Sequence, residues 1–345
     1  MGFGEPNCSG ILAPIELSYI TTTISILLAL VTFPGNLMVC LAIVLDPYKE
    51  LRTPFNYLLL SLATTDLIVG AFMDPLTAVF HYSEAKKLNL VSYEILHVPF
   101  FILTTASLLT LAALAIDRYI AVRFPHMYKT KLTAKRALIA TAIIWTISIG
   151  MSVIYFELGF IPSLFIFANV AVISTFIVLV FVYSSIYKKL ISQMKMFDKN
   201  KLPKDKTERK EKRNVLQAMR KDRKINQALV QILIAFAVCY TPACVMIYFL
   251  NMCSTCNCTL VHWFRDLQFV IVLLNSAINP YLYAFRLPQF RKAFQKLVRF
   301  PAINQVSCLD TDSKLSSTKT PGFAEEIVKF HKIDWLEISV NREEN

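Results

Sequence analysis

Long apolar runs, each about the length of a membrane-crossing helix, recur along this 345-residue chain. The third is the clearest, because residues 95–116 contain no Asp, Glu, Lys or Arg, and a transmembrane helix needs roughly 20 predominantly apolar residues. Further runs of this kind lie at residues 17–45, 54–80, 137–156, 163–187, 225–250 and 267–285. The chain is only 17% charged, whereas soluble domains average about 25%. We therefore expect an all-α membrane protein, a seven-transmembrane helix bundle.

The distribution of basic residues predicts how the chain crosses the membrane. The net charge is +12, and residues 188–224 hold 15 Lys and Arg against 5 Asp and Glu, whereas residues 1–17 hold no Lys or Arg. Because positive charge gathers on cytoplasmic loops, we expect a multi-pass plasma-membrane protein with its N-terminus outside and its C-terminus inside. The basic residues then flank a membrane, which argues against nucleic acid as a partner. The long basic loop fits either helical extensions of the fifth and sixth spans or a solvated, partly disordered face.

This pattern divides the chain into three parts. We expect an extracellular N-terminus at residues 1–16, a membrane domain at 17–299 and a flexible cytoplasmic tail at 300–345 whose serines and threonines are available for phosphorylation. The membrane domain should end in a short amphipathic helix at 288–299, because Phe290 and Phe294 are interspersed with Arg291, Lys292 and Lys296. Such a helix lies in the membrane surface with its apolar face down.

Polar residues inside the apolar runs need a physical explanation. Asp66 falls near the middle of the second span, where an unpaired carboxylate is costly. It therefore either faces a polar cavity or is protonated and hydrogen-bonded. Asp74 is explained equally well by a helix end beside a kink and by a contact with a ligand. Asn36 should face a neighbouring helix, for the same reason as Asp66. The third run ends in Asp117 and Arg118, where hydrocarbon gives way to water.

The sixth and seventh spans carry residues typical of helices that bend or present a polar face. Pro242 removes a backbone hydrogen bond from the sixth span and should kink it. Asn275, Asn279 and Tyr283 recur at four-residue steps, so they share one face of the seventh helix.

Together these residues resemble the rhodopsin-like (class A) G-protein-coupled receptors over about residues 17–299. The resemblance rests on motifs in the right order along the seven spans: Asn36, Leu62-Ala63-x-x-Asp66, Asp117-Arg118-Tyr119, Trp145, Tyr183, Phe236 before Pro242, and Asn279-Pro280-x-x-Tyr283. It implies a receptor that performs no covalent chemistry. Its implied partners are an extracellular ligand, a heterotrimeric G protein, membrane lipids and, through the tail, arrestin and a receptor kinase.

The resemblance also implies roles for single residues. A sodium ion is the one bound ion implied, and the residues that match the family's central sodium pocket are Asp66, Ser107, Asn275 and Asn279. Arg118 would pair at rest with Asp117 and with Asp222 of the sixth span. On activation the sixth helix would swing outward at Pro242 and open a groove for a helix of the G protein. The implied coupling and switch positions are Asp117, Arg118, Tyr119, Tyr183, Asp222, Phe236, Tyr240, Pro242, Pro280 and Tyr283.

Departures from the family pattern indicate a subgroup. The start of the third span and the loop at 157–162 contain no Cys, so the disulfide that usually joins them is absent. This, with the short loop, a fifth span without proline and the pair Cys256-x-Cys258, resembles the melanocortin receptors, in a wider cluster with adenosine, cannabinoid and lysolipid receptors. That analogy implies disulfides between Cys8 and Cys258 and between Cys253 and Cys256, although four cysteines permit three connectivities.

Missing residues narrow the choice of ligand. The acidic cluster of melanocortin receptors is replaced by Leu76, Tyr93 and His97, the third span has no aminergic Asp, and residues 267–285 have no Lys for retinal. An open aromatic pocket remains, which suits a small amphipathic, lipid-like or nucleoside-like molecule. The residues assigned to this pocket are Asp74, His97, Phe100, Phe101, Tyr240 and Tyr248. Ordinary helix packing is the alternative explanation for each aromatic residue.

Other functional classes fit the chain less well. A transporter or channel is the main rival, but we find neither an internal repeat nor paired broken helices around a midplane site. An intramembrane enzyme would need a catalytic motif such as His-Glu-x-x-His, which is absent. A receptor-like protein that only modulates partners stays open, because Tyr240 replaces the family's usual Trp. Asn7 and Asn257 begin Asn-x-Ser/Thr triplets and are candidates for glycosylation.

Overall fold

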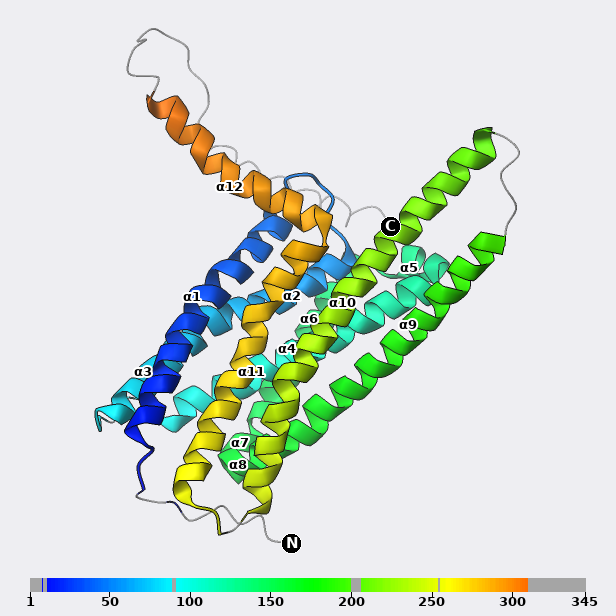
Figure 1. Cartoon of the computed structure of the whole chain (residues 1–345). Coiled ribbons are helices and arrows are strands. Elements are labelled where there is room, and N and C mark those ends of the chain that lie inside the picture. The colour runs from blue at the N-terminus through cyan, green and yellow to red at the C-terminus, as the bar shows by residue number, and fades with distance from the viewer. Residues whose placement is uncertain (1–7, 9–10, 89–90, 200–205, 254, 310–345) are drawn as a thin grey trace, which may run out of the picture. The chain divides into compact units, whose positions relative to one another are not determined.

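A computed structural model of the chain describes residues 8, 11–88, 91–199, 206–253 and 255–309. Two compact units divide the chain, Met1–Leu297 and Val298–Asn345, and the features below belong to the first. Throughout the described residues the regular elements are helices (Figure 1). The expected all-α class is confirmed.

Each predicted span corresponds to one helix or to helical segments joined by an irregular turn. The first is α1 (Ile15–Leu45), and the second is α2 (Pro54–Ile68), the π-helical turn η1 (Val69–Met73) and α3 (Asp74–Ala85). The third is α4 (Tyr93–Arg123), followed by the short α5 (Pro125–Lys131). The fourth is α6 (Ala134–Ser152) with α7 (Ile154–Leu158), and the fifth is α8 (Phe160–Phe167), the π-helical turn η2 (Ala168–Val172) and α9 (Ile173–Lys199). The last are α10 (Lys206–Met252), α11 (Cys258–Arg286) and α12 (Pro288–Leu309).

Within the described ranges, six helical segments are long and apolar enough to cross a membrane. They comprise α1, α2–α3, α4, α6–α7, α8–α9 and the second half of α10. Helix α11 falls outside this set, and its first half carries the charged pair Arg265 and Asp266. It nevertheless packs along α1 and α10 and completes the seven-helix bundle (Figure 1).

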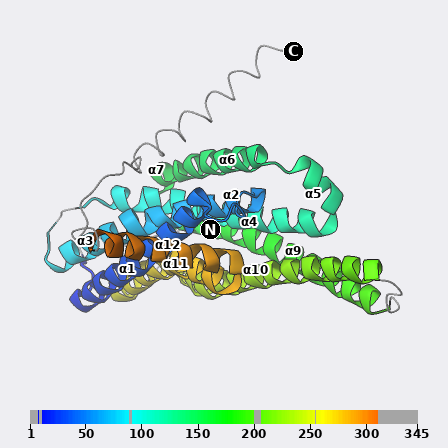
Figure 2. The ribbon, with the colours of Figure 1, turned by 90° about the horizontal axis from the view of Figure 1, so that it is seen from above.

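Helix α4 forms the interior of the bundle. It packs against α2, α6 and α9. Seen from above, it lies between α6 and α9 (Figure 2). Its apolar run therefore meets other helices rather than lipid alone. Since α4 ends in the Asp117–Arg118 pair, the most enclosed helix carries that pair to one end of the bundle.

Close approaches join α1 to its neighbours. The Nδ2 atom of Asn36 donates to the backbone carbonyl of Ser276 on α11 at 3.2 Å, which confirms that Asn36 faces a neighbouring helix. A Cβ atom on Gly35 would lie 2.8 Å from Cγ of Pro280. A Cβ atom on Gly70, in η1, would lie 2.5 Å from the backbone nitrogen of Phe33. Glycine is therefore required where η1 meets α1.

Helices on either side of the basic loop extend beyond the predicted spans. Helix α9 continues to Lys199 and α10 begins at Lys206, so the backbone matches the helical-extension alternative, while residues 200–205 lie outside the described ranges. Helix α12 continues to Leu309, past the predicted end at residue 299. Its first turns pack into the first unit, where Phe290 and Ala293 are buried.

Replacing Gly70 by Ala should lower the melting temperature of the purified protein, because the new methyl group meets a backbone atom that cannot rotate away. Overpacking of this kind costs about 1–3 kcal/mol. Gly150 on α6 is the matched control, since a Cβ atom there would have nothing within 4 Å. Thermal unfolding in detergent distinguishes the two, and equal melting temperatures for Gly70→Ala and Gly150→Ala would contradict this account of the contact.

Candidate functional site

A buried ion pair with a tyrosine closes one end of α4. The Nη2 atom of Arg118 lies 2.5 Å from Oδ2 of Asp117 and donates to the hydroxyl oxygen of Tyr128 at 2.6 Å. The Tyr128 hydroxyl in turn lies 3.3 Å from the same carboxylate oxygen. The Arg118 guanidinium also sits 4.3 Å from the ring centre of Phe55 on α2. Arginine is thus held by a carboxylate, a phenol and an aromatic face.

The chain after α4 positions this tyrosine. Pro125 occupies the first turn of α5 directly after Phe124, and proline is well suited to that helical position. The short helix folds back and brings Tyr128 beside the end of α4. Burial, with the neighbouring Asp117 carboxylate adding to it, raises the pKa of Tyr128 to about 12. The hydroxyl therefore stays protonated at neutral pH.

The sequence alone did not indicate Tyr128 or Phe55. Neither belongs to a motif, and their proximity to Arg118 arises only from how α5 and α2 pack. The predicted partner Asp222 lies outside the residues whose side chains are described, as does the side chain of Tyr283. Other switch positions fall inside the bundle: Tyr183, Phe236, Tyr240 and Pro280 are buried. Tyr119 faces α9, with its ring centre 6.4 Å from that of Phe181.

A cavity of about 420 Å³ lies beside the Arg118 cluster, between α4 and α9. Its lining residues are Tyr119, Val122, Arg123, Ser185, Ile186, Lys188, Lys189 and Ser192. The lining is polar and basic, unlike the apolar surface along the middle of the bundle. This end therefore offers a hollow with positive charge.

Four buried residues of the second, third and seventh spans each have a side-chain oxygen without a hydrogen-bond partner in the described part of the chain. Asn279 Nδ2 donates to Oδ2 of Asp66 at 2.8 Å. Among the described residues, no hydrogen-bond partner is found for Asp66 Oδ1, Ser107 Oγ, Asn275 Oδ1 or Asn279 Oδ1. All four residues are buried, and unpaired buried polar atoms are rare and need an explanation. The residues predicted to form a sodium pocket each present such an atom.

The predicted ligand-pocket residues divide between two places. His97 stacks on Phe160 with ring centres 3.8 Å apart, and Phe100 stacks on Phe269 at 4.1 Å. Phe101 packs edge-on against Phe167. These third-span residues are buried, and their ring contacts match the packing alternative. Phe101 also borders a small hollow that Tyr155 and Phe167 line from the fourth and fifth spans. A ligand pocket around these residues stays a prediction. Asp74, directly after η1, is also completely buried.

An open groove lies between the fifth and sixth spans. Its volume is about 420 Å³, and its lining residues are Val172, Ile173, Phe176, Phe236, Ala237, Tyr240, Thr241, Cys244, Val245 and Tyr248. Phe236 and Tyr240 contact each other with ring centres 4.7 Å apart, whereas Val245 is 64% exposed. The groove thus runs from a buried aromatic pair to the outer surface of the bundle. Tyr248 donates to Oδ1 of Asn169 at 2.5 Å and supplies a polar edge.

Two disulfides tie the opposite end of the bundle together. Cys8 pairs with Cys258 and Cys253 pairs with Cys256, as the sequence analogy implied. The first links the N-terminal segment to the start of α11 across 250 residues. Asn257 lies beside this disulfide and is exposed, whereas Asn7 lies outside the described residues.

Replacing Tyr128 by Phe should reduce the stability of the purified protein by about 1.5–3 kcal/mol, because a hydrogen bond to a charged group contributes that much. Tyr187, which is 67% exposed, provides the control substitution Tyr187→Phe. Thermal unfolding measures both variants. A melting temperature that Tyr128→Phe leaves at the wild-type value would show that the hydroxyl does not support the Arg118 cluster.

Known proteins resemble this chain over most of its length. A family model described as "7 transmembrane receptor (rhodopsin family)" matches residues 35–161 and 157–283. The chain is 27% identical to adenosine receptor A2a of Homo sapiens, an alignment that covers 85% of this chain and 75% of the relative. It is 26% identical to adenosine receptor A2a of Canis lupus familiaris, with 82% and 73% covered. It is also 26% identical to adenosine receptor A2b of Mus musculus, with 80% and 88% covered.

Proposed function

The chain belongs to the rhodopsin family of seven-transmembrane receptors, and on that basis we propose that it passes the binding of an extracellular ligand to a heterotrimeric G protein. Members of this family are receptors rather than enzymes. In the proposed orientation the Cys8–Cys258 disulfide lies outside the cell, where disulfides persist, and the Arg118 cluster lies at the cytoplasmic end. The relatedness to adenosine receptors is established, while the melanocortin-like features stay a prediction.

The Arg118 cluster is proposed to hold the resting state. Asp117, Tyr128 and Phe55 occupy the faces of the guanidinium that a G-protein helix would otherwise contact. Release of Arg118 would expose charge next to the basic hollow between α4 and α9. A two-state arrangement of this kind is selected by any ligand that binds one state better than the other. The tail is proposed to recruit a receptor kinase and arrestin.

The groove between the fifth and sixth spans is proposed to bind a small amphipathic, lipid-like ligand. The observation that carries this proposal is the position of Phe236 and Tyr240, which line the groove and contact each other within the two helical turns before Pro242. An apolar ligand against this pair would change the packing of α10 next to its proline. Its apolar lining and exposed edge at Val245 allow entry from the bilayer.

A nucleoside-like ligand is the second candidate. The relatives described above are named adenosine receptors, and the groove carries a polar pair at one edge, Tyr248 and Asn169. An amide and a phenol are suitable partners for the hydrogen-bonding edge of a base. In that case the polar edge, rather than the apolar floor, would determine affinity.

Sodium is the ion proposed for the middle of the bundle. Asp66, Ser107, Asn275 and Asn279 would hold it, because each offers a buried oxygen without a hydrogen-bond partner in the described structure. Hard cations prefer such oxygen ligands. The ion would neutralise the buried Asp66 carboxylate and bring together residues from the second, third and seventh spans.

Expression in cells should shift cyclic AMP, and Arg118→Ala should abolish the shift, because the guanidinium is the proposed contact for the G protein. The measurement compares both proteins at equal surface display, with and without forskolin, while a panel of lysolipids, fatty-acid amides and nucleosides is applied. Direct measurement of G-protein dissociation extends the test to other pathways. A wild-type response that persists in Arg118→Ala would contradict the proposed coupling.

Filling the groove should weaken an active lipid by at least about tenfold, because Val245→Trp places a large side chain where the ligand would lie. Val238→Trp is the matched control, since Val238 is 66% exposed on the same helix and does not line the groove. Dose–response curves of the active compound measure both variants. If both variants lose potency equally, or if neither variant loses potency, the groove is not the binding site.

A further inference from the structure

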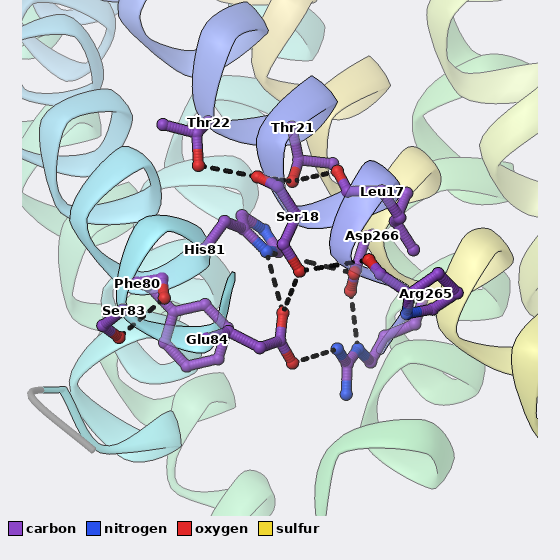
Figure 3. Close-up of polar contacts among 11 residues, drawn as sticks. Leu17, Ser18, Thr21, Thr22, Phe80, His81, Ser83, Glu84, Arg265 and Asp266 are labelled. Carbon is purple, nitrogen blue, oxygen red and sulfur yellow. Dashed lines mark hydrogen bonds and ion pairs between the residues drawn. The ribbon is translucent and has the colours of Figure 1, made fainter. Parts of the chain in front are cut away.

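A compact cluster of metal-ligand side chains lies at the Cys8 end of the bundle. His81 and Glu84 come from α3 and Asp266 comes from α11, and Figure 3 shows these side chains pointing toward one another. The Nδ1 atom of His81 lies 3.4 Å from Oε2 of Glu84 and 3.9 Å from Oδ2 of Asp266. All three candidate ligand atoms lie within 4.8 Å of one another. Two spans that are distant in sequence therefore present one nitrogen and two oxygens to a common point.

Arg265 contacts one oxygen of each of the two carboxylates. Its Nε donates to Oδ1 of Asp266 at 2.7 Å, and its Nη2 lies 3.6 Å from Oε1 of Glu84. The other oxygen of each carboxylate, Oδ2 and Oε2, faces His81 (Figure 3). Arginine thus fixes both carboxylates and leaves one oxygen of each on the histidine side. Partners of this kind orient metal ligands in known sites.

One of these oxygens is left without a hydrogen bond. Asp266 is 3% exposed, and its Oδ2 has no hydrogen-bond partner in the described part of the chain. Glu84 Oε2 accepts a hydrogen bond from Ser18 of α1 at 3.2 Å. Two carboxylates against one arginine leave a net charge of −1 when His81 is neutral. A buried, negatively charged site with an unpaired oxygen favours a cation.

We propose that His81, Glu84 and Asp266 bind a zinc ion, with Arg265 as a positioning residue. Zinc takes nitrogen and carboxylate ligands at about 2.0–2.2 Å in tetrahedral geometry, which places neighbouring ligand atoms roughly 3.3–3.5 Å apart. The two separations from His81, 3.4 and 3.9 Å, are close to this range, and the three ligand atoms lie within 4.8 Å of one another, so zinc binding requires the carboxylates to move inward. Calcium and magnesium prefer all-oxygen sites of six or more ligands, so imidazole selects against them.

A metal ion can reach the site from solvent past Glu84 and Arg265. The side chains of Glu84 and Arg265 are 11% and 17% exposed, and α3 ends at Ala85. Three protein ligands leave the fourth position to water or to a group on another molecule. The bound ion would fasten the ends of the second and seventh spans together. Metal binding itself depends on this geometry and not on the proposed signalling function.

The test uses the full-length protein, purified in detergent without chelators, with Zn²⁺ as the probe. Zinc should raise the melting temperature, Ca²⁺ should not, and Co²⁺ should give the intense visible absorption of a tetrahedral site. His81→Gln, Glu84→Gln and Asp266→Asn should each lower the zinc affinity at least about tenfold, since even outer-shell partners contribute 10- to 100-fold. Glu94→Gln, which removes an exposed carboxylate from the start of α4, should leave the response unchanged.

Two results would overturn the proposal. The first is a wild-type protein that gives neither a zinc-dependent melting shift nor a tetrahedral Co²⁺ spectrum, which would leave His81 only as an ion-pair partner of the two carboxylates. The second is an equal response of Asp266→Asn and Glu94→Gln to zinc, which would place the metal elsewhere. The Co²⁺ spectrum is read on the wild-type protein, so the test does not depend on a variant that fails to fold.

Discussion

The pairing of Arg118 with Asp117 is the interaction on which the rest of the account depends. A charge at the end of a buried helix is tolerated only with a partner, and here the partner is the preceding residue. Tyr128 and Phe55 complete the enclosure. Breaking one buried pair costs several kcal/mol unless another partner replaces it. The cluster is therefore suited to its proposed role, in which it holds the resting state until contacts with a G protein replace it.

The same requirement organises the other polar sites. In the middle of the bundle Asp66 accepts a hydrogen bond from Asn279, and its other oxygen has no hydrogen-bond partner among the described residues. At the Cys8 end Arg265 joins Glu84 to Asp266, next to His81. The seventh span takes part in both of these sites.

The sequence predicted the helices better than it predicted the cavities. Long uncharged runs determine membrane spans, because the hydrocarbon core admits little else, and motif residues such as Asn36 follow from the cost of an unpaired amide. The two π-helical turns and the approach of Gly70 to Phe33 depend on how helices meet, which no local pattern records. The ring partners of the predicted pocket residues depend on helix packing for the same reason: Phe160 stacks on His97, and Phe269 stacks on Phe100. Tyr128 reaches Arg118 only through the turn into α5.

Basal nucleotide exchange tests the central claim most directly. The purified protein in lipid nanodiscs would be mixed with purified heterotrimeric G protein, and GTP uptake would be followed for wild type and Tyr128→Phe at equal receptor concentration. Because the phenol helps to hold Arg118 beside Asp117 and Phe55, we expect faster exchange without ligand for Tyr128→Phe than for wild type. Exchange that is unchanged or slower in the variant would contradict the view that this cluster maintains the resting state.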